Sequence, residues 1–262
     1  MITSLADRRI PKRKDRYTSV IALTLISLVI LTFPFWGRFL PGVDEFVVNQ
    51  IATYLIIVFF IIGMGTNVYV WWRLQSKWEA LATQIGLNVE SYKPNSLTFL
   101  PWPRIIGLYR GHQLKVERFT KYSGRRRKTH TSISLQFEES SQEQLFITPR
   151  GFLPRLGDIF KMQDVKLHDV IFGYDEFDRS LAVRSTSDYF AKSVLVSQGI
   201  RQGLIELKPQ APDMQLAILS KDVHYQERTS ITDTEYMLAV INLLVDITDY
   251  AKRYRQQLRT SV

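Results

Sequence analysis

Basic side chains crowd into one short stretch, residues 121–130 (KYSGRRRKTH), which surrounds Gly124. Its five cationic residues are Lys121, Arg125, Arg126, Arg127 and Lys128. Guanidinium and ammonium groups at this density bind phosphates or carboxylates, so the stretch predicts contact with nucleic acid, anionic lipid headgroups or an acidic protein. A solvated turn that contacts nothing would have the same composition.

The excess of positive charge is local. From Arg73 to the C-terminus the chain has 27 Lys and Arg residues against 21 Asp and Glu, a net charge of +6. Residues 104–130 alone hold 9 basic residues and one acidic residue, Glu117, so the rest of this part is slightly acidic. The count therefore predicts a basic patch, with anionic lipid or an acidic protein favoured as partner over nucleic acid.

Three carboxylates lie close together in the stretch GYDEFDRS: Asp175, Glu176 and Asp178. Carboxylates at this spacing could bind a divalent cation or share a proton. The alternating ligands and the distant Glu of a calcium-binding loop are missing. The competing interpretation is a polar turn with Phe177 in the core and Arg179 paired nearby.

The four histidines are His112, His130, His168 and His224, and none has a partner at the spacing of a zinc site. We expect His112 and His130 to face each other across a hairpin. The sequence has no phosphate-binding glycine loop, no GxSxG motif and no cysteine. These observations predict no catalytic residue and no cofactor, and they favour a protein that is not an enzyme.

Two apolar segments precede this region, residues 18–36 and residues 51–72, and neither contains a charged residue. At ~1.5 Å per residue each segment is long enough to cross the ~30 Å hydrocarbon core of a bilayer. Trp36, Trp71 and Trp72 lie at segment ends, where indole rings favour the lipid interface. The sequence therefore predicts a transmembrane hairpin.

The distribution of basic residues predicts its orientation. Six of them precede the first segment: Arg8, Arg9, Lys12, Arg13, Lys14 and Arg16. The loop between the segments has only Arg38, whereas Arg73 and Lys77 follow the second segment. Positive residues remain on the cytoplasmic side, so both termini are expected there.

The predicted organisation has four parts: a basic cytoplasmic tail (1–17), the transmembrane hairpin (18–72), a helical stalk with a Pro-rich linker (73–103), and a cytosolic α+β domain (104–262). In the stalk, Leu74, Trp78, Leu81 and Ile85 recur at helical spacing, and Gly86 is the expected helix stop.

Period-two alternation predicts an antiparallel hairpin whose strands flank the basic stretch. Residues 169–184 predict a strand–turn–strand pair, and residues 214–228 a second hairpin. A helix over 187–204 is expected to begin at Ser187. A long helix over 233–257, with Thr232 and Glu235 as a capping box, is expected to pack on the sheet.

The motifs IxGxYRGH (residues 105–112) and GYDEFDRSLAVRS (residues 173–185), with two apolar segments and a stalk before them, resemble uncharacterised bacterial membrane proteins of unknown function. The resemblance implies a cytosolic α+β domain behind two N-terminal transmembrane helices, in a bacterial inner membrane. It implies no activity.

The leading hypothesis is a membrane-anchored cytosolic interaction or scaffolding module that uses the basic hairpin as its contact surface. One alternative is a membrane-bound metal-dependent enzyme that uses Asp175, Glu176 and Asp178. Another is a small accessory subunit of a larger membrane complex, in which Gly63 and Gly65 give the second segment a small-residue face for helix contact.

Overall fold

The computed structural model describes residues 45–92, 101–123, 126–137, 140, 142–151, 166–229 and 231–260. The predicted basic tail (1–17) and first apolar segment (18–36) lie outside these residues. The chain divides into two compact units, residues 14–74 and a larger unit that contains residues 75–262, and each is considered by itself.

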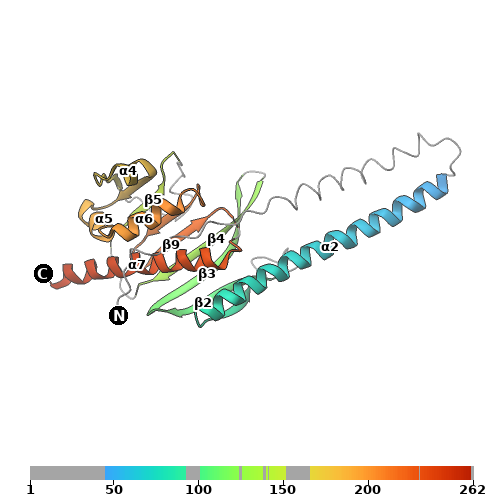
Figure 1. Cartoon of the computed structure of the whole chain (residues 1–262), viewed down its shortest axis with the longest axis horizontal. Coiled ribbons are helices and arrows are strands. Elements are labelled where there is room, and N and C mark those ends of the chain that lie inside the picture. Colours follow the sequence, from blue (N-terminus) through green and yellow to red (C-terminus); the bar gives the residue numbers. More distant parts are fainter. Residues whose placement is uncertain are drawn as a thin grey trace. The chain divides into compact units, whose positions relative to one another are not determined.

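The larger unit is built on a nine-stranded antiparallel sheet (Figure 1). Its strands are β1 (Asn88–Tyr92), β2 (Trp102–Tyr109), β3 (His112–Ser123), β4 (Arg126–Gln136), β5 (Leu145–Pro149), β6 (His168–Asp169), β7 (Leu181–Ser185), β8 (Gln215–Ile218) and β9 (Asp222–Glu227). Their order in the sheet is β1-β2-β3-β4-β9-β8-β5-β7-β6. The first four strands thus form a meander, and β9 returns to pair with β4.

Alternation along the strands separates an apolar face from a polar face. One row of paired residues, all buried, crosses seven strands: Ile105, Val116, Ile133, Tyr225, Leu216, Ile147 and Val183. The adjacent row consists of Glu90, Arg104, Glu117, Ser132, Gln226 and Gln215. Because successive side chains in a strand point to opposite faces, these two rows lie on opposite faces of the sheet.

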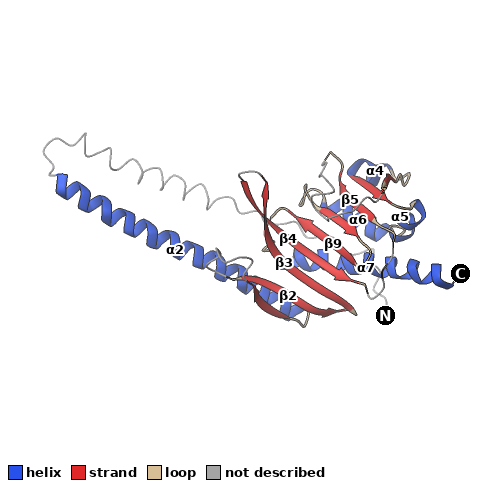
Figure 2. Ribbon diagram, turned by 180° about the vertical axis from the view of Figure 1, so that it is seen from behind, coloured by secondary structure: helices blue, strands red, loops and turns tan. Residues whose placement is uncertain are grey.

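Helices cover the apolar face. They are α4 (Asp175–Ser180), α5 (Asp188–Val194), α6 (Gln198–Leu207) and the long C-terminal α7 (Thr234–Thr260). Figure 2 shows the opposite face, where no described helix lies over β3, β4 and β9. The predicted α+β class, with an antiparallel sheet packed by helices that include a long C-terminal one, is confirmed.

Several local predictions are corrected. Residues 169–184 contain the short helix α4 between β6 and β7 rather than a simple turn. Ser187 caps α5 as predicted, accepting a hydrogen bond from Phe190 N, but the helix stops at Val194 and α6 starts afresh. The Arg201 guanidinium donates to the carbonyls of Leu195 and Val196 at 2.6 Å, which satisfies acceptors that the end of α5 leaves open.

The start of α7 is capped by Asp233 rather than by a Thr232–Glu235 capping box. Asp233 Oδ1 accepts hydrogen bonds from the backbone amides of Glu235 and Tyr236, both at 3.1 Å. Aspartate and threonine are both good N-cap residues, so their adjacency makes the sequence ambiguous by one position.

The sheet begins earlier than predicted. Strand β1 and the first residues of β2 lie within the range 73–103 that was expected to be stalk and linker. As an edge strand, β1 pairs only with β2 and contributes one apolar partner, Val89 opposite Ile105. Five residues with so little alternation give no period-two pattern.

Helix α2 (Glu45–Gln84) is continuous over 40 residues. It stops just before Gly86, which has φ 72° as the predicted stop requires. Among the described residues, the stretch Thr53–Gln84 is the one helix long and apolar enough to cross a membrane, by length and composition. Its apolar side chains between Tyr54 and Trp72 are largely exposed.

Candidate functional site: a basic two-stranded ribbon

Strands β3 and β4 extend beyond both of their neighbours (Figure 1). Strand β2 pairs with β3 only up to Glu117, and β9 pairs with β4 only up to Thr131. The pairs beyond them, from Phe119↔His130 to Ser123↔Arg126, form a two-stranded projection. We call residues 119–123 and 126–130 the ribbon.

The ribbon contains four of the five predicted basic residues, and Arg125 lies outside the described residues. Lys121 lies directly opposite Lys128, and Arg126 and Arg127 follow opposite Ser123 and Tyr122. Like charges directly opposite each other destabilise a strand pair. The fold therefore tolerates a local repulsion that a bound anion would relieve.

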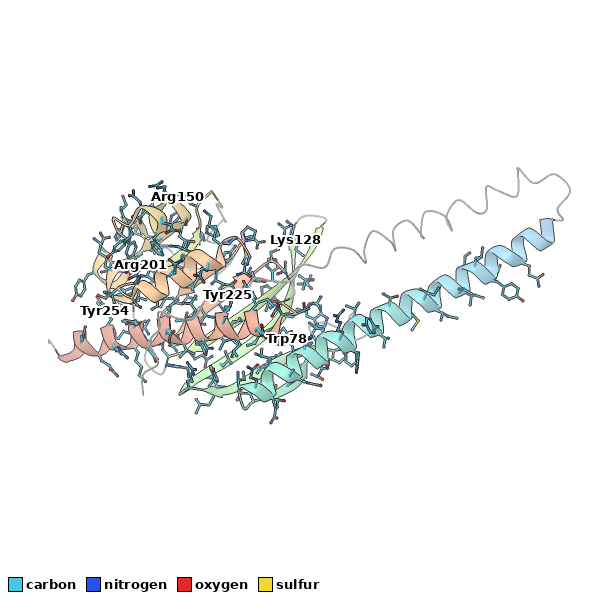
Figure 3. All side chains as sticks on the ribbon, viewed as in Figure 1. Trp78, Lys128, Arg150, Arg201, Tyr225 and Tyr254 are labelled. Carbon is cyan, nitrogen blue, oxygen red and sulfur yellow. The ribbon has the colours of Figure 1, made fainter. Side chains whose placement is uncertain are left out.

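Among the described residues, acidic side chains near the ribbon are engaged elsewhere. Glu117 is the single acid in the predicted basic region, and it lies below the ribbon, 2.8 Å from Lys115 Nζ and 3.7 Å from Arg104 Nε. Lys128, labelled in Figure 3, is half-buried and pairs with none of the acids that the structure describes. The register and the sequence thus make the ribbon a concentration of basic residue positions in the larger unit.

Hydrogen bonds on both faces of the sheet hold the base of the ribbon. On the polar face, the His130 ring stacks on Phe119 with centroids 5.3 Å apart, and its Nδ1 lies 3.2 Å from Gln226 Nε2. On the apolar face, Thr131 Oγ1 donates to the carbonyl of Thr229 at 2.7 Å and accepts from the amide of Ile231 at 3.1 Å.

A buried carboxylate lies beneath this base. Glu227, 1% exposed, pairs with Thr131 in the ladder and accepts hydroxyl hydrogen bonds from Tyr225, Tyr236 and Thr229 at 2.6–2.9 Å. Burial raises the pKa of Tyr225 well above its usual value, and the Glu227 charge adds to the effect. The Tyr225 hydroxyl thus remains a protonated donor, and the network fixes the strand that pairs with the base of the ribbon.

The end of α2 docks beside the same base. Trp78 is fully buried, and its Nε1–H donates to the carbonyl of Ile231 at 3.2 Å. Farther along, Leu87 lies against Gly107, where an added Cβ would come within 2.6 Å of Leu87 Cδ2. Trp78 and Leu87 are therefore two anchor points that fix the end of α2 and the residues after it on the sheet.

The two anchor points give a direction. Gly107 lies level with Leu135 of β4, whereas the Trp78 partner Ile231 is bonded to Thr131, four residues nearer to the ribbon. Helix α2, followed from Gln84 back to Trp78, thus runs toward the ribbon. The part of α2 that belongs to the larger unit, from Gln75 onward, therefore runs from the end of the sheet from which the ribbon projects.

The predicted histidine pair does not form. His112 lies opposite Tyr109 at the far end of β3, and its Nε2 is 2.8 Å from Asp249 Oδ1 of α7. His130 lies opposite Phe119 instead. His112 begins β3 and His130 lies in β4, and the hairpin register separates them along the strands.

The acidic cluster performs local structural roles. Asp178 accepts hydrogen bonds from three backbone amides, those of Phe172, Gly173 and Tyr174, at 2.8–3.2 Å. Asp175 pairs with Arg179 at 2.9 Å. The described residues contain no group of three or more His, Cys, Asp or Glu side chains that could hold a metal ion.

Replacing Asp178 by alanine is expected to destabilise the larger unit by about 1–3 kcal/mol, because three amides lose their acceptor. Asp175→Ala, which removes only an exposed ion pair, is the matched control and should change stability by less than about 1 kcal/mol. Both are measured by thermal unfolding with and without Mn²⁺. A Mn²⁺-dependent rise in the wild-type midpoint that Asp178→Ala abolishes would instead support the metal alternative.

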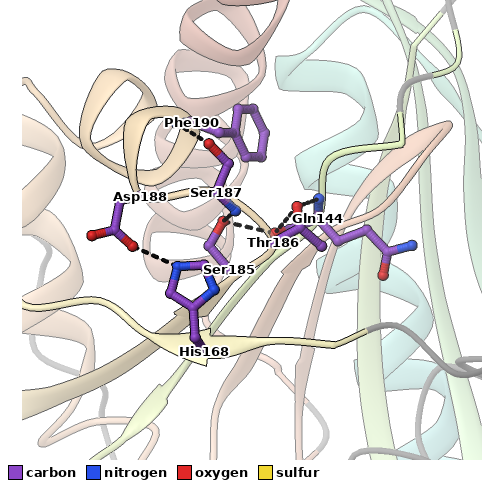
Figure 4. A network of polar contacts seen from close by, with 7 residues as sticks. All are labelled: Gln144, His168, Ser185, Thr186, Ser187, Asp188 and Phe190. Atoms are coloured by element: carbon purple, nitrogen blue, oxygen red, sulfur yellow. Dashed lines mark hydrogen bonds and ion pairs between the residues drawn. The ribbon is translucent and has the colours of Figure 1, made fainter.

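A second polar cluster, which sequence analysis did not identify, lies at the start of α5 (Figure 4). His168 Nε2 contacts Asp188 Oδ1, and the nearby Ser185 gives the cluster the composition of a catalytic triad. However, Ser185 is fully buried and donates its hydroxyl to the carbonyl of Gln144 at 2.9 Å. Because a triad requires the histidine to accept the serine proton, this arrangement is a connection between strands rather than a nucleophile.

The sequence matches no family model and no curated protein. Among solved structures, the larger part of the chain is similar to the mycobacterial trehalose monomycolate transport factor A. The match has a TM-score of 0.46 and 10% sequence identity, and it covers 68% of this chain and 93% of that one.

Proposed function

We propose that the chain is a membrane-anchored cytosolic interaction or scaffolding module whose contact surface is the ribbon. The observation that carries this proposal is the Lys121–Lys128 pair. The two residues are in register on a projection at the end of the sheet toward which the docked part of α2 runs. Like charges at opposed positions lower the stability of the free protein. An anionic partner relieves this repulsion when it binds, and the relief contributes to its affinity.

The anchor is the hydrophobic part of α2. Twelve of its large apolar side chains between Tyr54 and Trp72 are more than 45% exposed, which is typical of a helix covered by lipid or by other membrane helices. With residues 18–36 as the proposed partner span, the basic residues of the tail favour a cytoplasmic position for both termini. Insertion beside other helices would equally suit an accessory subunit of a larger membrane complex.

The chemistry of the partner follows from the ribbon. Lysine and arginine side chains bind phosphate or carboxylate oxygens, so the partner is an anionic lipid surface or an acidic protein. Asp178 is already engaged by backbone amides and Asp175 by Arg179, which favours this binding role over a metal-dependent reaction.

Crosslinking in living cells tests the proposal with the full-length chain. A photoreactive amino acid at Ser123 should give a specific adduct, with lipid or with an acidic protein. The variant Arg126→Glu/Arg127→Glu should reduce the adduct at least severalfold, since attraction becomes repulsion. The matched control Arg110→Glu/Lys221→Glu makes the same charge change at the opposite end of the sheet and should leave the adduct intact.

Equal adduct yields in wild type, ribbon variant and control would contradict the proposal. Sidedness is checked separately, because the chain has no cysteine and Ser123→Cys creates a single thiol. Labelling of that thiol by a membrane-impermeant reagent in intact cells would place the ribbon outside the cytoplasm and contradict the proposed orientation.

A further inference from the structure

We infer that the partner of the ribbon is the bilayer in which the same chain is anchored, through the anionic headgroups of its phospholipids. The inference rests on the proposed function and deepens it. The proposed function allows a lipid or a protein partner, and the inference selects the lipid.

The first step is the distance between the ribbon and the apolar segment. Trp78 is fixed beside the ribbon base through Ile231 and Thr131, and Trp72 ends the uncharged stretch. The six residues from Trp72 to Trp78 rise about 9 Å as a helix, and even fully extended they span at most about 20 Å. The base of the ribbon therefore lies within reach of the bilayer surface in any arrangement of the two units.

The second step is the length of the ribbon. From Thr131 to Arg126 it extends five residues, or about 17 Å at ~3.3 Å per residue. The headgroup region on one side of a bilayer is only about 5–7 Å thick. A projection that is longer than the helical rise of the linker can bring its basic end to this layer.

The third step concerns the direction in which the chain runs and the charge of the ribbon. Within the larger unit, the docked residues of α2 run toward the end of the sheet from which the ribbon projects, so the chain connects to the apolar segment from that end. Attraction between Lys or Arg and an anionic leaflet acts within a Debye length of about 8 Å, so it requires this proximity. Because the anchor holds the ribbon at high effective concentration, weak individual contacts suffice.

The composition of the ribbon favours lipid over protein. A stable protein interface has an apolar centre with large anchoring side chains. Here Phe119 is already engaged in its stack on His130, and the remaining described positions are Lys, Arg, Thr, Ser and Tyr122. Tyrosine among cations is a typical composition for contact with the membrane interface.

The test uses the full-length chain in lipid nanodiscs with a fluorophore on a single engineered cysteine. Ser123→Cys reports on the ribbon, and Ser220→Cys, in the β8–β9 turn at the opposite end of the sheet, is the control. The nanodiscs contain phosphatidylcholine alone or mixed with phosphatidylglycerol, plus a lipid with a quencher on its headgroup. We expect severalfold stronger quenching at position 123 than at position 220, only in the anionic discs.

High salt, or the additional change Arg126→Glu/Arg127→Glu, should reduce quenching at position 123 to the control level. Equal quenching at both positions in anionic discs would overturn the inference, as would strong quenching at position 123 in neutral discs. Failure of the chain to insert into discs would instead refute the anchored module itself. Normal insertion without quenching, together with a protein adduct in cells, would leave the proposed function intact with a protein partner.

Discussion

Replacing Trp78 by alanine is expected to lower the thermal unfolding midpoint of the larger unit by about 10 °C, because Trp→Ala in a core costs about 3–5 kcal/mol. The indole is fully buried, and its loss removes both packing and the hydrogen bond to the Ile231 carbonyl. Near-ultraviolet circular dichroism of the full chain in nanodiscs would measure the effect.

Two further variants make the Trp78 result specific. Trp78→Phe retains most of the buried surface but loses the N–H donor, so a loss of only about 1–3 kcal/mol is expected. Lys77→Ala, at an exposed position on the same turn, should change stability by less than about 0.5 kcal/mol. A Trp78→Ala midpoint within the error of wild type would show that α2 does not dock on the sheet, and the distance argument for the ribbon would then fail.

Acidification from pH 6.5 to pH 4 is expected to remove up to about 3 kcal/mol of stability through His224 alone. Burial lowers the pKa of His224 to about 4, an effect to which the Lys115 charge adds and the Glu117 charge is opposed. Between these two pH values the unfolded chain binds a proton at His224 that the folded chain does not. His224 therefore does not lower the unfolding free energy above pH 6.5. Its effect grows as the pH falls from 6.5 to 4.

Comparing wild type with His224→Gln isolates this contribution. Glutamine does not titrate and keeps a polar group near Ser132 Oγ, which lies 3.3 Å from His224 Nε2. Between pH 7 and pH 4 the wild type should lose about 2–3 kcal/mol more unfolding free energy than the variant. A difference independent of pH would show that His224 is accessible to protons in the folded state.

Local patterns predicted the elements on which the site depends. Period-two alternation indicated the two strands that flank the basic stretch, and helical spacing indicated a helix that contains Trp78 and Leu81. These features depend on residues within one or two turns or strands. The structure confirms the two strands and the helix, and it shows in addition that both side chains are buried.

Features that depend on distant segments were not predictable in this way. The ribbon exists because β2 ends its pairing at Arg104 and β9 ends at Glu227, and neither limit can be read from the hairpin itself. The same holds for the His130–Gln226 contact, whose partners are 96 residues apart. The expected His112–His130 pair was wrong because the two residues lie at unequal distances from the turn, 12 residues before Gly124 and 6 after it, so His130 pairs with Phe119.

The place of β9 beside β4 also affects how the chain emerges during synthesis. Strand β4 ends at Gln136 and β9 at Glu227, so 91 further residues must be made before the pair can close. At ~5–20 residues per second, one edge of the newly made β1–β4 meander remains unpaired for roughly 5–20 seconds. Open strand edges promote association between chains, so this interval, rather than the finished fold, is when a nascent chain is most exposed to aggregation.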